Sequence, residues 1–226
     1  MAAPANITIK NLNGQWVMDA GLSDPTDPIL TLQGVSWFLR KALPYATVTL
    51  HVKEYADSEN SLVYHIDIDQ IITGGITGTK ESRTLDWQER SHVDTIFGTV
   101  HGRSRMFRGA KGGDGKTRPA VDVQSKVGEP EADAKVQKFL RGEIQLDGSA
   151  SEGFIVDDEG AEFGEGEGLW VQSYVVNQEV GWTAEQVWGF ELVQGERRYT
   201  RRVAVVKDGK VELGRLVYTF QEPQAE

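Results

Sequence analysis

Charged and aromatic side chains occur at alternate positions along several stretches of the chain, and this is the pattern of β-strands with two different faces. In residues 77–89, Arg83, Leu85 and Trp87 would share one face. If Leu85 and Trp87 point into a core, Arg83 does so too, and a buried guanidinium group needs an anionic or carbonyl partner. Its partner is either a ligand oxygen or the carboxylate of Glu81, and both alternatives stay open.

Two further side chains could take part in chemistry. His101 lies in residues 92–108, which we expect to form one long strand, on a face shared with Phe97. An imidazole can transfer protons near neutral pH, although a lone histidine is more often a structural group. Arg201 shares a strand face with Tyr199 and could polarise a carbonyl group. Together with Arg83, these two are the candidate catalytic residues if the protein is an enzyme.

The strand faces that we expect to point inward carry many aromatic rings and several polar groups. Each unsatisfied buried polar group would cost about 1–3 kcal/mol, so a fully packed core is not expected. A hollow interior that binds a polar-decorated hydrophobic ligand explains the pattern better. The candidate ligand-binding residues are Trp16, Phe38, Gln70, Trp87, Phe97, Gln172, Tyr174, Gln186, Trp188, Tyr199 and Tyr218.

The elements that would position these residues begin with a short strand at 14–18, which places Trp16 on one face. Asp27 suits a helix N-cap and Pro28 the first helical position, so a helix is expected from there to about Leu43. Strand patterns follow it. They cover residues 46–55, 62–72, 77–89, 92–108, 169–176, 184–193, 197–206 and 211–220.

Residues 109–165 differ in composition, since they are rich in Gly, Asp, Glu, Lys and Pro. We interpret this segment as an insertion of low regularity at the end of a hairpin. Its glycine-rich start, residues 109–117, misses the spacing of a phosphate-binding loop. Residues 132–140 could form a short helix with Val136, Phe139 and Leu140 on its apolar side, and the segment could cover the barrel mouth as a lid.

A family resemblance rests on three features of residues 13–52: Gly14-x-Trp16 on the first strand, the helical segment 34–41, and the strands that follow. These features resemble those of intracellular fatty-acid-binding proteins, and the Gly-x-Trp element is shared with lipocalins, so the resemblance is to the wider calycin superfamily. The resemblance weakens over later strands and is absent from 109–165. It implies a mainly β fold.

That fold is a single antiparallel up-and-down β-barrel domain spanning residues 1–226, with one helix between its first two strands and a long loop insertion. Fatty-acid-binding proteins commonly hold a ligand carboxylate with Arg-x-Tyr on the last strand. Here Arg215 and Tyr218 would lie on opposite faces of that strand. Arg201 and Tyr199 could supply an equivalent anchor from the preceding strand.

Composition argues against several classes of partner. The net charge of −10 and the absence of a basic stripe make nucleic acid an unlikely partner. The chain has no cysteine and its four histidines are scattered, while Asp67 and Asp69 should face solvent, so we expect neither a metal nor a cofactor. No apolar run approaches the ~20 residues of a membrane span, so we expect a cytoplasmic protein without stable membrane insertion.

Three functions remain open from the sequence. The first is the binding of a hydrophobic small molecule of lipid, polyketide or terpenoid type inside the barrel. The alternative is a cofactor-independent cyclase or isomerase, such as a pericyclase of Diels–Alderase type, which needs shape, aromatic walls and hydrogen-bond donors. The third is a scaffold without a ligand. Whether the protein is an enzyme, and its oligomeric state, stay undecided.

Overall fold

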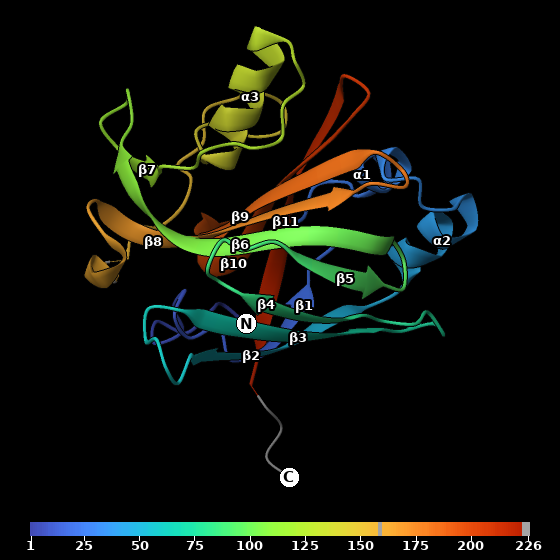
Figure 1. Cartoon of the computed structure of the whole chain (residues 1–226), viewed down its shortest axis with the longest axis horizontal. Helices are drawn as coiled ribbons and strands as arrows, with labels where there is room; N and C mark the ends of the chain where they lie inside the picture. The colour runs from blue at the N-terminus through green and yellow to red at the C-terminus, as the bar shows by residue number, and fades with distance from the viewer. Residues whose placement is uncertain (158–159, 223–226) are drawn as a thin grey trace.

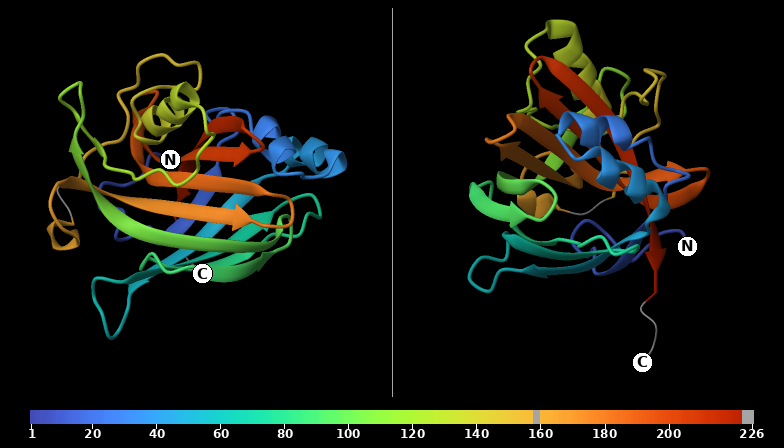
Figure 2. Two further views of the ribbon diagram at one scale, coloured as in Figure 1. Left: turned by 45° about the horizontal axis from the view of Figure 1, so that its top comes forward. Right: turned by 90° about the vertical axis from the view of Figure 1, so that its right-hand side faces the viewer.

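The computed structural model describes residues 1–157 and 160–222; residues 158–159 of the expected insertion lie outside the described part, as do 223–226. Its main feature is an 11-stranded antiparallel sheet, within that part, with the strand order β4-β3-β2-β1-β11-β10-β9-β8-β6-β5 and β7 paired to β6 (Figure 1). The sheet curls around an apolar interior (Figure 2). The expected mainly β, antiparallel barrel-like fold with a helical segment after the first strand is confirmed.

The bounds of the elements follow. The strands are β1 (Gly14–Met18), β2 (Val48–Ala56), β3 (Tyr64–Ile72), β4 (Lys80–Thr84), β5 (Arg90–Asp94), β6 (Gly98–Lys111), β7 (Thr117–Pro119), β8 (Glu167–Asn177), β9 (Trp182–Val193), β10 (Glu196–Lys207) and β11 (Lys210–Gln221). The helices are α1 (Asp27–Leu32), α2 (Trp37–Ala42) and α3 (Pro130–Leu140), with single 3₁₀ turns at 43–45 and 161–163.

The helical segment after β1 is two short helices, and the expectation of one helix up to Leu43 is wrong. Gly34 has a φ of +81°, a conformation that ends α1 and that glycine adopts at low cost. Ser36 then caps α2 by accepting a hydrogen bond from the backbone N–H of Leu39. Asp27 is the first helical residue rather than the N-cap, and it pairs with Arg40 at 2.5 Å.

Trp16 lies at the centre of the interior, with no exposed surface. It stands opposite Leu50 of β2 and Phe220 of β11 in the strand register. Its indole contacts the rings of Phe190, Tyr199 and Phe220, with centroids 5.0–6.3 Å apart. The aliphatic alternation of β2 and β3 therefore points inward as expected.

Both ends of the curled sheet are covered. At one end the N-terminal segment buries Ile7, Ile9 and Leu12 against the Trp16 cluster. At the other end Ile29 of α1 packs with Trp182 and other apolar side chains. The first and last strands of the sheet, β4 and β5, do not pair with each other, so one side of the curl is not closed by a ladder.

Most of residues 117–154 cover the outer face of the sheet, so the expectation that the helix at 132–140 forms a lid over the barrel mouth is wrong. Ile155 and Phe163 instead pack against the interior cluster. The expected helix is confirmed as α3, and Val136, Phe139 and Leu140 are fully buried as proposed. They pack in one cluster with the outward-facing Trp170 and Val187. In Figure 1, α3 lies at the top of the view, whereas β2–β4 form the bottom layer.

A buried ion pair attaches this covering segment to the sheet. The Arg202 guanidinium contacts Glu191 at 2.8 Å and donates to the carbonyl groups of Phe139 and Ile144. Both charged side chains are essentially inaccessible to solvent. The outer face of β9 and β10 is therefore a second core rather than a solvated surface.

Residues 92–108 form a hairpin and not the single strand that we expected. The carboxylate of Asp94 accepts hydrogen bonds from the N–H groups of Ile96 and Phe97, and Gly98 has a φ of +71°. In β6, Val100, Ser104 and Met106 face the interior, as their registers with β5 and β8 require. His101, Arg103 and Arg105 alternate with these residues and consequently lie on the outer face.

Candidate functional site

Two arginine side chains meet over one indole inside the barrel. Trp188 on β9 is fully buried and stands opposite Arg201 of β10 in the register. The Cζ atom of Arg201 lies 4.0 Å from the centroid of the Trp188 ring, and that of Arg83 lies 5.5 Å from it. Both distances are within the range of cation–π contacts. Trp188 thus holds two positive groups in an otherwise apolar interior.

Arg83 is paired with Glu81, which is the internal alternative left open by the sequence. Its Nη2 and Nε atoms lie 2.6 and 2.9 Å from Oε2 of Glu81, and its Nη1 donates to the Ser173 hydroxyl at 2.8 Å. Burial raises the pKa of the Glu81 carboxyl, but the charges of Arg83 and Arg201 outweigh burial and hold it below its ordinary value. Glu81 is therefore a carboxylate at neutral pH.

Arg201 is incompletely paired. Only 7% of its surface is exposed, and its Nε donates to the Tyr199 hydroxyl at 3.0 Å. Its Nη2 is buried and has no hydrogen-bond partner within the described residues. Burial raises the pKa of both Tyr199 and Tyr218, so these phenols stay neutral and keep their protons. The Nη2 group of Arg201 can donate a hydrogen bond to an oxygen atom of a ligand.

A cleft between β4 and the β5–β6 hairpin reaches Arg83 and Glu81 from the open side of the sheet, whereas Trp188 and Arg201 do not line it. It has a volume of about 250 Å³ and is lined by Glu81, Arg83, His92, Gly102 and Ser104, among others. A neighbouring cleft of about 540 Å³ shares Glu81 and His92 with it. Because β4 and β5 do not pair, the cleft can widen without breaking a backbone ladder.

Six of the expected ligand-binding residues face the interior in the structure. Gln186 accepts a hydrogen bond from Nε1 of Trp188 at 2.8 Å. Gln70 stands opposite the inward-facing Leu50. The other four are Trp16, Trp188, Tyr199 and Tyr218, which all belong to the core around Trp16. Phe97 packs edge-on against Trp182 near α1, at a distance from this cluster in the fold.

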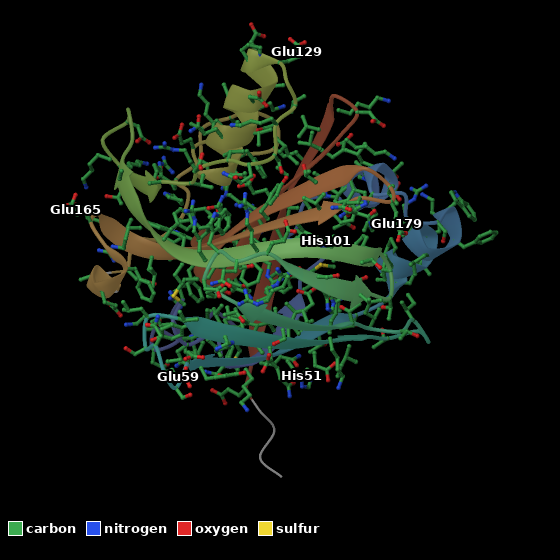
Figure 3. All side chains as sticks on the ribbon, in the orientation of Figure 1. His51, Glu59, His101, Glu129, Glu165 and Glu179 are labelled. Carbon is green, nitrogen blue, oxygen red and sulfur yellow. The ribbon has the colours of Figure 1, made fainter. Side chains whose placement is uncertain are left out.

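Five predicted site residues point elsewhere, so their expected inward position is wrong. Trp87 has a φ of +62° and is stacked by Arg103 and Arg105 outside the barrel. His101 stands opposite the outward-facing Val176 on β8 (labelled in Figure 3). The remaining three are Gln172, which pairs with Glu185, Tyr174, which lies beside Arg103, and Phe38, which is 80% exposed on α2.

The interior also holds two titratable groups that the sequence analysis missed. His92 faces the interior opposite Val100, and its buried Nε2 has no partner in the described chain. Glu54 accepts a hydrogen bond from the backbone N–H of Leu12 at 2.7 Å. Burial raises the pKa of Glu54 to about 8. A turn recognised after Asp94 would have placed His92 on the inward face of β5. Glu54 follows Leu50 and Val52 at every second position of β2, so the same alternation predicts that it faces inward.

The described residues contain no group of three or more His, Cys, Asp or Glu side chains arranged to hold a metal ion. Within the same part of the chain, no helix combines the length and the apolar character needed to cross a membrane. Asp67 and Asp69 stand opposite Lys53 and His51 on the outer face, as expected.

Known proteins resemble this chain in sequence and in fold. No protein-family model matches the chain. It is 28% identical over 223 residues to the probable pericyclase scpY of Mollisia scopiformis, covering 99% of this chain and 96% of that protein. It is 26% identical over 225 residues to the pericyclase pydY of Acremonium sp., with complete coverage of both chains.

Among solved structures, apo lipid binding protein 8 of Caenorhabditis elegans superposes with a TM-score of 0.51 at 11% identity, covering 96% of this chain and all of that one. The chain therefore has the fatty-acid-binding-protein-like calycin fold expected from residues 13–52. The two relatives bear the name pericyclase, which is the alternative expected from the sequence, and the solved structure shares the fold with this chain.

Proposed function

We propose that this protein binds a hydrophobic small molecule inside its β-barrel and catalyses a pericyclic ring closure of that molecule without a cofactor. The observation that carries the proposal is the buried Arg201, whose free Nη2 lies among aromatic rings instead of a matching carboxylate. A buried cationic donor without a partner lowers the free energy of unfolding, and destabilising groups of this kind are concentrated at ligand-binding sites. The two pericyclase relatives, similar over almost their whole length, support the same function.

A pericyclic reaction suits the residues present because it requires no covalent enzyme intermediate. In a [4+2] closure, six electrons of a diene and an alkene move in one cycle, so that three π bonds are replaced by two σ bonds and one new π bond. The barrel contributes by folding the chain of the substrate so that the reacting ends meet. Trp188, Tyr199 and Tyr218 supply rigid aromatic walls for this purpose.

Arg201 would donate a hydrogen bond from Nη2 to a carbonyl oxygen conjugated with the alkene. Withdrawal of electron density from the alkene lowers the barrier for attack by an electron-rich diene, and the donor is fixed before the reaction begins. The bond between Arg201 Nε and the Tyr199 hydroxyl holds the guanidinium in place. Gln186 orients the indole beneath it through Nε1 of Trp188.

The substrate would arrive through the cleft between β4 and β5. A volume of about 250 Å³ is below the ~300–1,000 Å³ of usual small-molecule sites, so the unpaired strand edges must separate on binding. Binding alone, as in a carrier, is the second candidate function, and the likeness of the fold to a lipid binding protein favours it.

The two functions are separated by incubating the protein with a linear trienone in which a conjugated diene and an enone are joined by a saturated tether. We expect a bicyclic product of unchanged mass, detected by chromatography and NMR, formed faster than in buffer. Arg201→Gln should remove most of the acceleration, whereas the same change on the outer face, Arg105→Gln, should preserve it. Return of the bound trienone unchanged would make the protein a carrier.

A further inference from the structure

The charged groups inside the barrel do not balance. Arg83 and Arg201 each carry a positive charge, and Glu81 supplies one negative charge that contacts Arg83 directly. Glu54 also faces the interior, but burial raises its pKa to about 8, so it is mostly neutral at pH 7. The Trp188 cluster therefore keeps one uncompensated positive charge.

Other groups on the same side of the sheet do not remove this charge. The carboxylate of Asp94 lies at the β5–β6 turn, where it accepts hydrogen bonds from the backbone N–H groups of Ile96 and Phe97, and within the described residues it forms no ion pair with Arg83 or Arg201. His92 lies on the cleft side and cannot supply a negative charge. An isolated charge in an apolar interior is unfavourable until a counter-ion reaches it.

We propose that the substrate enters the barrel as a monoanion, and that Glu81 is the residue that limits its charge to one. Glu81 occupies Arg83 as an internal anion, so that Arg201 is the guanidinium left free for the ligand. This inference rests on the proposed binding of a ligand in the barrel. It adds the charge of the substrate and assigns Glu81 as a specificity-determining residue.

The anionic group should spread one charge over two oxygen atoms, because a guanidinium group matches such a pair with two of its N–H groups. A carboxylate and the enolate of a β-dicarbonyl compound both satisfy this requirement. In either case the charged oxygens would lie next to the rings of Trp188 and Tyr218, which border Arg201.

Binding of matched probes at pH 7 tests the inference. The probes share a dodecyl chain and differ in the head group: dodecanamide is neutral, dodecanoate and a dodecanoyl cyclic β-diketone carry one charge, and dodecylmalonate carries two. Affinities come from quenching of tryptophan fluorescence and from calorimetry. We expect the wild-type protein to bind at least one monoanion about tenfold or more tightly than the amide.

Glu81→Gln keeps the size of the side chain and removes its charge. We expect this variant to bind the monoanions about tenfold more tightly than the wild type, to accept dodecylmalonate, and to bind the amide unchanged. Arg201→Gln should abolish the preference for anions. Glu59→Gln, the same chemical change on an exposed loop, serves as the control and should match the wild type.

Each outcome bears on the inference. Equal affinity of the wild type for amide and monoanions, or no gain in Glu81→Gln with an unchanged circular dichroism spectrum, would overturn it. If the monoanion preference holds but the trienone is not cyclised, the proposed ring closure fails and the inference stands. If the trienone is cyclised without any charge preference, the inference alone fails. If no probe and no trienone binds, both fail.

Discussion

Arg201 lies over the indole of Trp188 with its Cζ atom 4.0 Å from the ring centroid, and no described residue accepts a hydrogen bond from its Nη2. Cation–π contacts with one indole and two phenol rings compensate only part of the cost of burying a guanidinium group. The stability of the ligand-free protein is therefore reduced at the place where we propose that the ligand binds.

Replacement of Arg201 should separate stability from function. We expect Arg201→Met to raise the free energy of unfolding by about 1–3 kcal/mol, because it substitutes an apolar chain for an incompletely paired buried charge. The same variant should lose most of its ring-closing activity. Urea denaturation measures the first effect, and a loss of stability in Arg201→Met would show that Arg201 is a structural residue.

Glu54 should make stability depend on pH. Its pKa is raised by burial from the ordinary 4.5 to about 8, so between these values the unfolded chain has lost the proton that the folded protein retains. Stability should therefore fall as pH rises through this window, by at most about 1.4 kcal/mol per pH unit from this group.

The matched variant Glu54→Gln should flatten this dependence and be more stable than the wild type at pH 8. Its side-chain oxygen can still accept the hydrogen bond from Leu12. Denaturation at a series of pH values gives the comparison, with Glu59→Gln as the exposed control. Parallel curves for the wild type and Glu54→Gln would refute the assignment of a neutral Glu54.

The cleft between β4 and β5 should be sensitive to added volume at Gly102. A side chain there would meet Val175 at ordinary van der Waals distance, so Gly102→Val should fold normally and narrow the cleft. We expect KM for the trienone to rise about tenfold, in keeping with the loss of a well-fitted apolar contact. Gly113→Val, in a loop with open space around it, should leave KM unchanged.

The ion pair of Arg202 and Glu191 should stabilise the covering segment on the outer face. We expect Glu191→Gln to cost about 3–5 kcal/mol, because it leaves a buried guanidinium without its counter-ion. Limited proteolysis should then cut first within residues 109–165. Cleavage and denaturation curves equal to those of the wild type would contradict this role.

On β2 and β3, where only one face of the strand is buried, the sequence identified the inward face correctly. β2 and β3 alternate between apolar and polar residues because their outer face meets solvent, and Trp16, Leu50 and Gln70 were placed correctly. β8 is buried on both faces, since α3 and its neighbouring loops cover the outside. Its alternation carries no direction, and this is why Gln172 and Tyr174 were assigned to the wrong face.

The site itself could be predicted only in part. Arg83, Arg201 and Trp188 lie on strands whose aromatic and aliphatic neighbours fix their direction, and the structure brings them together. His101 was chosen in place of His92 because the turn after Asp94 was not recognised in the sequence. That turn depends on side-chain caps and on one glycine with positive φ, which are weaker signals than strand alternation.

The most direct test of ring closure under Arg201 compares two trienone probes that differ at one position. The first has a carbonyl group next to the alkene, and in the second that carbonyl is reduced to an alcohol, which cannot draw electron density from the alkene. With the wild-type protein, we expect kcat/KM, corrected for the rate in buffer, to be at least about tenfold higher for the ketone. With Arg201→Gln, we expect this corrected ratio to fall to about 1. An undiminished ratio in Arg201→Gln would contradict the role of Arg201 in ring closure.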